Sequence, residues 1–260
     1  MSRLIDALQA DPRQLIGLWQ EVFGDPPELP AAFLRQLPAI GCGWAAVEEG
    51  RVLGAAYWID ALHLGEARCG YLYAVAVRPE ARGQGLGAAL SRACWESGRE
   101  RGAVYACTEP AEASLFDWYG EILGAEPVLF RQATELAAAA GAPAEPISAE
   151  DYAERREALL RNSAHVRYAP EALVYEQANC RCFGGDLYRI GEGIADAIRE
   201  DGVLLVRECL GPDPEALAAA LGAALGCGRV RLLRSAAEGE RFLAGNRAFP
   251  AGTVFNITFD

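Results

Sequence analysis

An α/β fold (α+β by some schemes), divided into two domains, is predicted for this chain from three observations. Helical and strand patterns alternate along residues 1–136 and again along residues 148–260. The segment between them, residues 137–147, is rich in Ala and Pro, as a linker would be. The chain has 260 residues, of which 52% are hydrophobic and 23% charged, so it can bury two cores of ordinary size.

Two helical segments open the first domain. The first begins at Asp11-Pro12, a capping residue followed by proline at the first helical position, and it ends at Gly24. Its apolar residues recur on one face, at Leu15, Leu18, Trp19, Val22 and Phe23. A second, shorter helix is expected over residues 30–37.

Strands and helices then alternate to the end of the first domain. Residues 43–47 and 52–59 flank Glu49-Gly50, which predicts a β-hairpin. Residues 71–77 are almost entirely apolar or aromatic, as a central strand should be. The elements that follow are a helix over 86–101, a strand over 104–107, a helix over 113–123 and a strand from 128 onward.

Beyond the linker the order of elements partly repeats, although the sequence does not. The expected helices are 150–161, 170–179 and 214–225, and the expected strands are 186–190, 194–199, 203–210, 229–233 and 253–260. This order predicts a second copy of the same architecture.

The charge balance and the apolar pattern exclude two kinds of partner. Twenty-four basic against 36 acidic residues give a net charge of -12, which argues against nucleic acid as a partner. No run of apolar residues is long enough to span a membrane, so no membrane partner is expected. The first residues carry acids where a signal peptide has its apolar core, and we therefore expect a cytoplasmic protein.

Cysteine and histidine spacing gives no metal site. The eight cysteines form no C-x-x-C pair, and His63 and His165 lie far from any cysteine cluster. We therefore expect no metal, and thiols that stay reduced.

The most informative segment is a strand that runs through a glycine-rich turn into a helix. Its residues are Val75, Ala76 and Val77 of the strand, Arg82, Gly83, Gln84 and Gly85 of the turn, and Leu86, Gly87 and Ala88 of the helix. Glycines allow close approach of the backbone to a ligand, and the N–H groups of the first helical turn lie at the positive end of the helix dipole. Because Arg82 adds a charged donor, the segment predicts a cradle for a pyrophosphate.

Two other phosphate-binding motifs fail on details. A Walker loop requires Gly-Lys-Ser/Thr, and the sequence has no Lys at all. A dinucleotide fingerprint requires G-x-G-x-x-G, whereas Gly83, Gly85 and Gly87 have the wrong third spacing.

The segment Arg82-x-x-Gly85-x-Gly87 resembles the Arg/Gln-x-x-Gly-x-Gly/Ala motif of the GCN5-related N-acetyltransferases (GNAT superfamily). The resemblance extends from residue 1 to about residue 130, and residues 18–25 resemble the first helix of two-domain bacterial members. It implies two GNAT-like domains, each a mixed, twisted sheet with helices on both faces. In the family, acetyl-CoA lies where two parallel strands separate, and a bulged strand binds its pantetheine arm. By position, this implies the main chain of Val75 and Val77 here.

The resemblance also implies a chemistry: direct transfer of the acetyl group of acetyl-CoA, the cosubstrate, to a primary amine. A base must remove a proton from the amine. Glu109 is our first candidate for this base, Glu66, Tyr71 and Tyr73 are the others, and His63 is a further group near the expected cleft. The family's acid is a tyrosine in a stretch similar to aromatic-Tyr-x-x-x-Gly-Phe, which implies Tyr119. Here one extra residue separates Tyr119 from Gly124, and Ala125 replaces the aromatic residue.

The second domain is expected to lack the cofactor site. Its corresponding junction, residues 210–215, contains Pro212 and Pro214, which remove N–H donors, and Asp213 and Glu215, which repel phosphate. The resemblance does not identify the acceptor, which could be an antibiotic, a polyamine, an amino acid, a peptide or a protein N-terminus. A homodimer is also possible. The alternative function is a non-catalytic acyl-CoA-binding or regulatory protein on the same fold.

Overall fold

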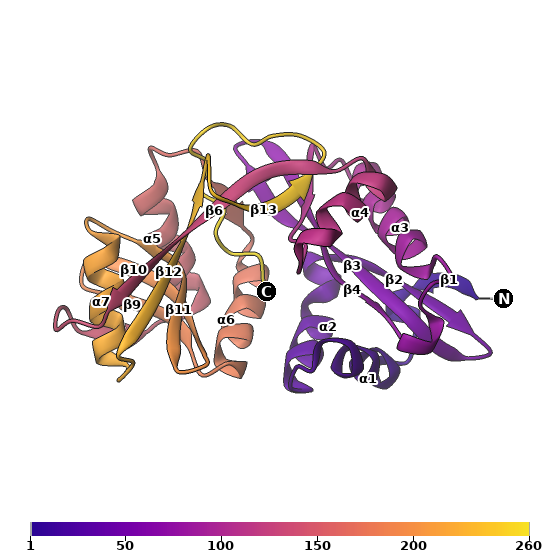
Figure 1. Ribbon diagram of the computed structural model, residues 1–260, viewed down its shortest axis with the longest axis horizontal. Coiled ribbons are helices and arrows are strands. Elements are labelled where there is room, and N and C mark those ends of the chain that lie inside the picture. The colour runs from indigo at the N-terminus through magenta and orange to yellow at the C-terminus, as the bar shows by residue number, and fades with distance from the viewer. Residues whose placement is uncertain (1, 260) are drawn as a thin grey trace. The chain divides into compact units, whose positions relative to one another are not determined.

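The structure is a computed structural model that describes residues 2–259 and divides into two compact units (Figure 1). Unit 1 comprises Met1–Val128 and Phe242–Phe249, and unit 2 comprises Leu129–Arg241 and Pro250–Asp260. By this division residues 137–147 lie within unit 2, and unit 1 takes in a segment from near the end of the chain. Among residues 2–259, no helix is both long and apolar enough to cross a bilayer.

Unit 1 is a mixed sheet in the order β1-β2-β3-β4-β5-β13, with helices on both faces. Its strands pair antiparallel except β4 with β5, which are parallel. In chain order the elements are β1 (Arg3–Asp6), α1 (Pro12–Phe23), α2 (Glu28–Ile40), β2 (Gly41–Glu48), β3 (Arg51–Leu64), β4 (Ala67–Val77), α3 (Leu86–Glu100), β5 (Tyr105–Thr108), α4 (Ala113–Leu123) and β13 (Glu240–Gly245).

The two faces of this sheet are packed by alternating side chains of the same strands. Tyr57 and Tyr73 contact Trp19 and Phe33 of α1 and α2. Trp58, the next residue of β3, faces the other way and packs against Trp95 of α3. Alternation along a strand therefore supplies both cores, which explains why residues 52–59 of β3 and 71–77 of β4 are apolar or aromatic throughout.

Local signals in the sequence set several element ends. The Asp11 carboxylate accepts a hydrogen bond from the Arg13 N–H (2.9 Å) and caps α1, which ends at Gly24 with φ 79°. Glu49 and Gly50, with φ 50° and 80°, form the two-residue turn of the β2–β3 hairpin. The predicted helices and strands of the first domain are thus present, with ends that differ by a few residues.

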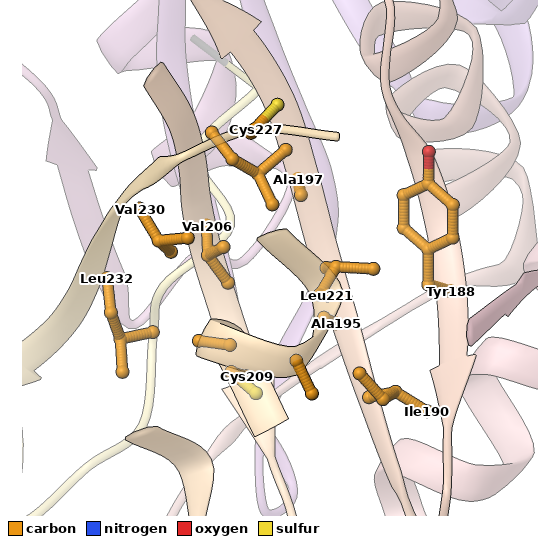
Figure 2. Close-up of a cluster of buried hydrophobic side chains, with 13 residues drawn as sticks. Tyr188, Ile190, Ala195, Ala197, Val206, Cys209, Leu221, Cys227, Val230 and Leu232 are labelled. Atoms are coloured by element: carbon orange, nitrogen blue, oxygen red, sulfur yellow. The ribbon is translucent and has the colours of Figure 1, made fainter. Parts of the chain in front are cut away.

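Unit 2 repeats this architecture with a sheet in the order β6-β12-β11-β10-β9-β7, in which only β11 and β12 are parallel. Its elements are β6 (Glu126–Ala137), β7 (Ala144–Pro146), α5 (Ala149–Leu160), β8 (Val166–Tyr168), α6 (Pro170–Cys182), β9 (Asp186–Ile190), β10 (Gly193–Glu200), β11 (Val203–Leu210), α7 (Pro214–Ala224) and β12 (Arg229–Ala236). Figure 2 shows the core of this unit, where Leu221 of α7 meets side chains from β9, β10, β11 and β12.

The predicted strand over residues 253–260 is wrong for the residues that the structure describes. Residues 255–259 belong to no strand, although the buried Phe255, Ile257 and Phe259 alternate with polar residues in the sequence. Their carbonyl groups pair with side chains, since Tyr168 Oη donates to Ile257 O (2.8 Å) and Asn179 Nδ2 to Phe259 O (2.9 Å). The alternation of apolar and polar residues produced the strand-like pattern, but these residues have no ladder partner. Asp260 lies outside the described residues.

Candidate active site

A cavity of about 720 Å³ opens in unit 1 beside the glycine-rich turn. Its lining combines the end of β4, the turn into α3, the end of α1 and one face of α4. The lining residues are Val22, Phe23, Val75, Val77, Ala81, Arg82, Gly83, Gly85, Leu86, Gly87, Ala88, Ala111, Glu112, Leu115, Trp118 and Tyr119.

The separation of β4 from β5 makes room for this cavity. The parallel pairing covers only Cys69–Tyr71 against Tyr105–Cys107, whereas β4 continues to Val77. On the other side of β4, the register with β3 shifts between Ala55 and Tyr57, so that β4 carries one extra residue. Ala74, in this bulge, has a φ of 47°, an uncommon conformation for a residue other than glycine. The bulge turns the following stretch of β4 toward the cavity.

The turn into α3 presents backbone donors without a side-chain cap. Gly83 and Gly85 have φ values of 75° and 78°, and a Cβ at either position would have no neighbour within 4 Å. Gly85 is the N-cap residue of α3, and no side chain there bonds to the N–H groups of the first turn. The Arg82 Nε donates to Val77 O (3.1 Å), which holds the base of this side chain beside the turn. An open, positive helix end beside an arginine fits a pyrophosphate.

Helix α4 supplies the opposite wall. Glu112, Leu115, Trp118 and Tyr119 recur at spacings of three and four residues and so share one face of the helix. The Trp118 ring packs beside Gly87, where a Cβ would lie 3.6 Å from it. Tyr119 is only 6% exposed, and its ring meets Trp118 edge to face at 4.9 Å.

The extra residue between Tyr119 and Gly124 is accommodated at the end of α4. The Tyr119 carbonyl accepts from the N–H groups of Gly124 and Ala125, five and six residues further on, the latter at 3.4 Å. The Gly124 N–H also bonds to the Gly120 carbonyl (3.0 Å), as in an ordinary α-helical turn, and Gly124 ends the helix with φ 67°. Tyr119 lines the cavity with this spacing.

Most of the residues selected from the sequence meet at this cavity. Those in the lining are Val75, Val77, Arg82, Gly83, Gly85, Leu86, Gly87, Ala88 and Tyr119. Ala76 is buried within the sheet, and the exposed Gln84 bonds through Nε2 to Glu80 O (3.5 Å) instead of lining the cavity.

The candidate bases lie outside the described lining. Glu109 is half-buried directly after β5, and its N–H donates to Tyr71 Oη (3.3 Å). Tyr73 packs its ring against Trp19 and Phe33. His63 and Glu66 lie at the far end of β3 and in the turn that follows it.

Seven lining residues were missed in the sequence: Val22, Phe23, Ala81, Ala111, Glu112, Leu115 and Trp118. The helical spacing that joins Leu115 and Trp118 to Tyr119 was a usable signal, because it places the three on one face. Val22 and Phe23 carried no such signal, since their place beside the turn depends on how α1 packs on the sheet.

The corresponding junction of unit 2 uses its donors within the protein. The Asp213 carboxylate accepts from the Ala216 N–H (3.1 Å) and caps α7, and Pro214 occupies the first helical position. Gly211 packs closely, since a Cβ there would lie 2.5 Å from the Leu217 side chain and 3.1 Å from Gly193. This helix end is therefore capped and covered, unlike that of α3.

The bulge of unit 2 contains a buried charge network instead of a cavity wall. The register of β10 with β11 shifts beside Asp196, which leaves Arg207 as the extra residue of β11. Its guanidinium pairs with Asp196 Oδ1 (2.9 Å) and Glu176 and also contacts Cys180 Sγ (3.2 Å). Burial raises the pKa of Glu176 well above its ordinary value; Arg207 opposes this shift and Asp196 adds to it.

The same three acidic and thiol groups form a cluster that could in principle hold a cation. Ligand atoms of Glu176, Cys180 and Asp196 lie within 4.8 Å of one another, all buried. Because Arg207 already donates to all three residues, its guanidinium supplies the positive charge in this cluster.

Comparison with known proteins agrees with the geometry of unit 1. Residues 5–125 match the model of the acetyltransferase (GNAT) family. No curated protein matches the sequence.

Three solved structures resemble most of the chain. A GCN5-related N-acetyltransferase from Kribbella flavida is 20% identical with a TM-score of 0.66, and the match covers 94% of this chain and 70% of that one. One from Anabaena variabilis is 15% identical with a TM-score of 0.63, covering 94% and 72%. Eis1 from Mycobacterium abscessus is 15% identical with a TM-score of 0.59, covering 94% and 73%.

These structural likenesses extend through both units and show the fold. The sequence match is confined to the residues that build the cavity and the sheet behind it. The match of residues 5–125 to this family supports acyl transfer as the general class of activity. Residues 5–125 of the chain therefore form an acetyltransferase domain of the GNAT family.

Proposed function

We propose that the protein is an N-acetyltransferase that transfers the acetyl group of acetyl-CoA directly to a primary amine. The single observation that carries the proposal is the cavity of unit 1, which joins an uncapped helix end to a bulged strand and a buried phenol. The pyrophosphate of the cosubstrate would bind the N–H groups of residues 83–88 and Arg82. The pantetheine arm would bind the main chain of Val75 and Val77, between β4 and α4.

In the proposed reaction, the amine first loses a proton to a base, and its lone pair attacks the thioester carbonyl carbon. The C–N bond forms, the C–S bond breaks, and the electron pair leaves with sulfur as a thiolate. A proton returned to the thiolate completes the release of CoA, and the second proton of the former ammonium group leaves to solvent.

We assign the return of the proton to Tyr119. Its phenol is protonated at neutral pH and can donate a hydrogen bond. The residue lines the same cavity as Val75 and is almost completely buried, so a thiolate there would have little water to take a proton from. After each turnover the hydroxyl would take a proton back from solvent.

Glu109 is our proposed base, acting on the amine directly or through a water molecule. It follows β5 at the point where the two parallel strands separate, and its main chain is held by Tyr71. A carboxylate there is also suited to attract a protonated amine, as is the net charge of -12.

We further propose that unit 2 does not bind CoA. In unit 2, the capped end of α7 lies at the position that corresponds to the cradle of unit 1. The Arg207 network lies at the position that corresponds to the strand bulge of unit 1. The closely packed Gly211 leaves no open turn for a phosphate.

Release of free thiol from acetyl-CoA over a panel of amines tests this function, run beside thermal unfolding with and without CoA. Amine-dependent thiol release together with a CoA-induced rise in the unfolding temperature is the expected result. A rise in unfolding temperature without thiol release from any amine would favour the alternative, a non-catalytic acyl-CoA-binding or regulatory protein.

A further inference from the structure

The parallel ladder between β4 and β5 ends abruptly, and its last rung shows why. Tyr71 is paired with Cys107, and a continued ladder would pair Leu72 with Thr108 next. The N–H and C=O of Ala106 point away from β4, because they bond to Asn246 Oδ1 and Asn246 N, both at 3.0 Å. Since main-chain groups alternate along a strand, those of Cys107 and then Glu109 face β4. The next ladder bond would therefore join the Glu109 N–H to the Leu72 carbonyl.

Side chains take both partners of that missing bond. The Thr108 hydroxyl donates to the Leu72 carbonyl at 2.9 Å. The Tyr71 hydroxyl accepts from the Glu109 N–H at 3.3 Å. The Thr108 bond is buried and the Tyr71 bond is partly buried, and the side chains of Tyr71 and Thr108 are only 1% and 2% exposed. Both peptide groups are thus satisfied without the strands continuing side by side.

We propose that Tyr71 and Thr108, here called the vertex pair, are positioning residues that end the ladder and hold β4 and β5 apart for CoA. This inference rests on the proposed function, because it assigns the pair a role in binding that cosubstrate. Neither residue is in the described lining of the cavity. The pair acts through the strands, by fixing the point from which Val75 on one side and Ala111 on the other diverge.

Removal of the pair has a definite consequence for the backbone. Without these side chains, the Glu109 N–H and the Leu72 carbonyl lose the hydrogen bonds that the pair provides, which is unfavourable. They can satisfy each other by forming the missing ladder bond. That extra rung draws the segment after β5 toward β4 and narrows the cavity between Val75 and Ala111.

The test compares Thr108→Val, which keeps the shape but removes the hydroxyl, with Tyr71→Phe and with the double variant. Titration calorimetry measures the affinity for CoA, and thermal unfolding measures stability. Each single variant is expected to bind CoA about 5- to 10-fold more weakly and to unfold at a lower temperature, since each removes one of the two hydrogen bonds that end the ladder. The double variant is expected to regain part of the stability yet bind CoA more weakly than either single variant.

Two controls separate positioning from general stability. Thr108→Ser retains a hydroxyl and should restore the affinity for CoA to within about twofold of wild type. Tyr57→Phe removes another buried phenol hydroxyl, from β3 and outside the cavity lining, and should leave the affinity unchanged.

Three results would each overturn the role of the vertex pair. These are an additive loss of stability in the double variant, a double variant that does not fold, and wild-type affinity for CoA in the double variant. In those cases wild-type protein still binds CoA, and the proposed function stands. Wild-type protein that does not bind CoA would instead overturn the proposed function, and with it the role of the pair.

Discussion

Gly85 is the position where a single substitution should separate ligand binding from folding. It is the N-cap residue of α3, with φ 78° and ψ 4°, and a Cβ there would have no protein neighbour within 4 Å. A side chain at Gly85 would therefore extend into the cavity without a clash inside the protein. Gly85→Glu adds a carboxylate at the positive helix end where the pyrophosphate is proposed to bind.

The expected magnitudes follow from this geometry. A left-handed conformation costs a residue with a Cβ about 1–2 kcal/mol, so Gly85→Glu should lower the free energy of unfolding by about that amount. Ligand at about 100 times its Kd stabilises the wild-type protein by roughly 2.7 kcal/mol. In a domain of this size, each kcal/mol shifts the unfolding temperature by about 2–4 °C, so the two effects can be measured separately.

Gly50→Glu is the matched control, because Gly50 has φ 80°, also has no neighbour within 4 Å, and does not line the cavity. Both variants should lose similar stability without ligand, but only Gly85→Glu should lose the rise in unfolding temperature that CoA produces. An undiminished rise in Gly85→Glu would show that the pyrophosphate site has been misplaced.

Three further predictions follow from particular residues. Tyr119→Phe keeps the ring and removes the hydroxyl, so kcat should fall by about 10²- to 10⁴-fold with nearly constant CoA affinity. Wild-type turnover of this variant, in an assay where chemistry limits the rate, would show that another group protonates the thiolate. Because the folded-state pKa of Glu176 is raised, the stability that its proton contributes is complete below pH 4.5 and is lost as pH rises through the folded-state value. Glu176→Gln should thus gain stability relative to wild type by up to about 1.4 kcal/mol per pH unit across that window. Chemical unfolding that shows no such pH trend would contradict a raised pKa of Glu176. Gly98→Ala should destabilise unit 1 because a Cβ there collides with the Trp58 ring, although alanine is the better helix former. Gly17→Ala in α1, where a Cβ has nothing within 4 Å, should instead stabilise the protein by about 0.5–1 kcal/mol. Equal effects of the two variants on the unfolding temperature would refute the packing of Gly98 against Trp58.

Local signals made much of the fold predictable. Asp11 and Gly24 mark the ends of α1. The start of α3 could be predicted from the Arg82–Gly87 segment, because its glycines directly precede the apolar helical pattern. The core positions of β3 and β4 follow from the uninterrupted apolar and aromatic runs at residues 52–59 and 71–77.

The features that escaped prediction depend on partners distant in sequence. β13 pairs with β5, and Asn246 bonds the main chain of Ala106, across 140 residues of sequence. The edge strand β1 is short and mostly exposed, so its sequence has no clear alternation. Residues 253–259 have the alternation of a strand but bond to side chains such as Asn179, which no local pattern could indicate.

The central claim, that unit 1 holds one CoA in the cavity beside α3 and that unit 2 holds none, is tested most directly by calorimetric titration of the whole chain with CoA. We predict one site per chain, abolished by Gly85→Glu and retained in Gly50→Glu. Two sites per chain, or one site that survives Gly85→Glu, would contradict the account.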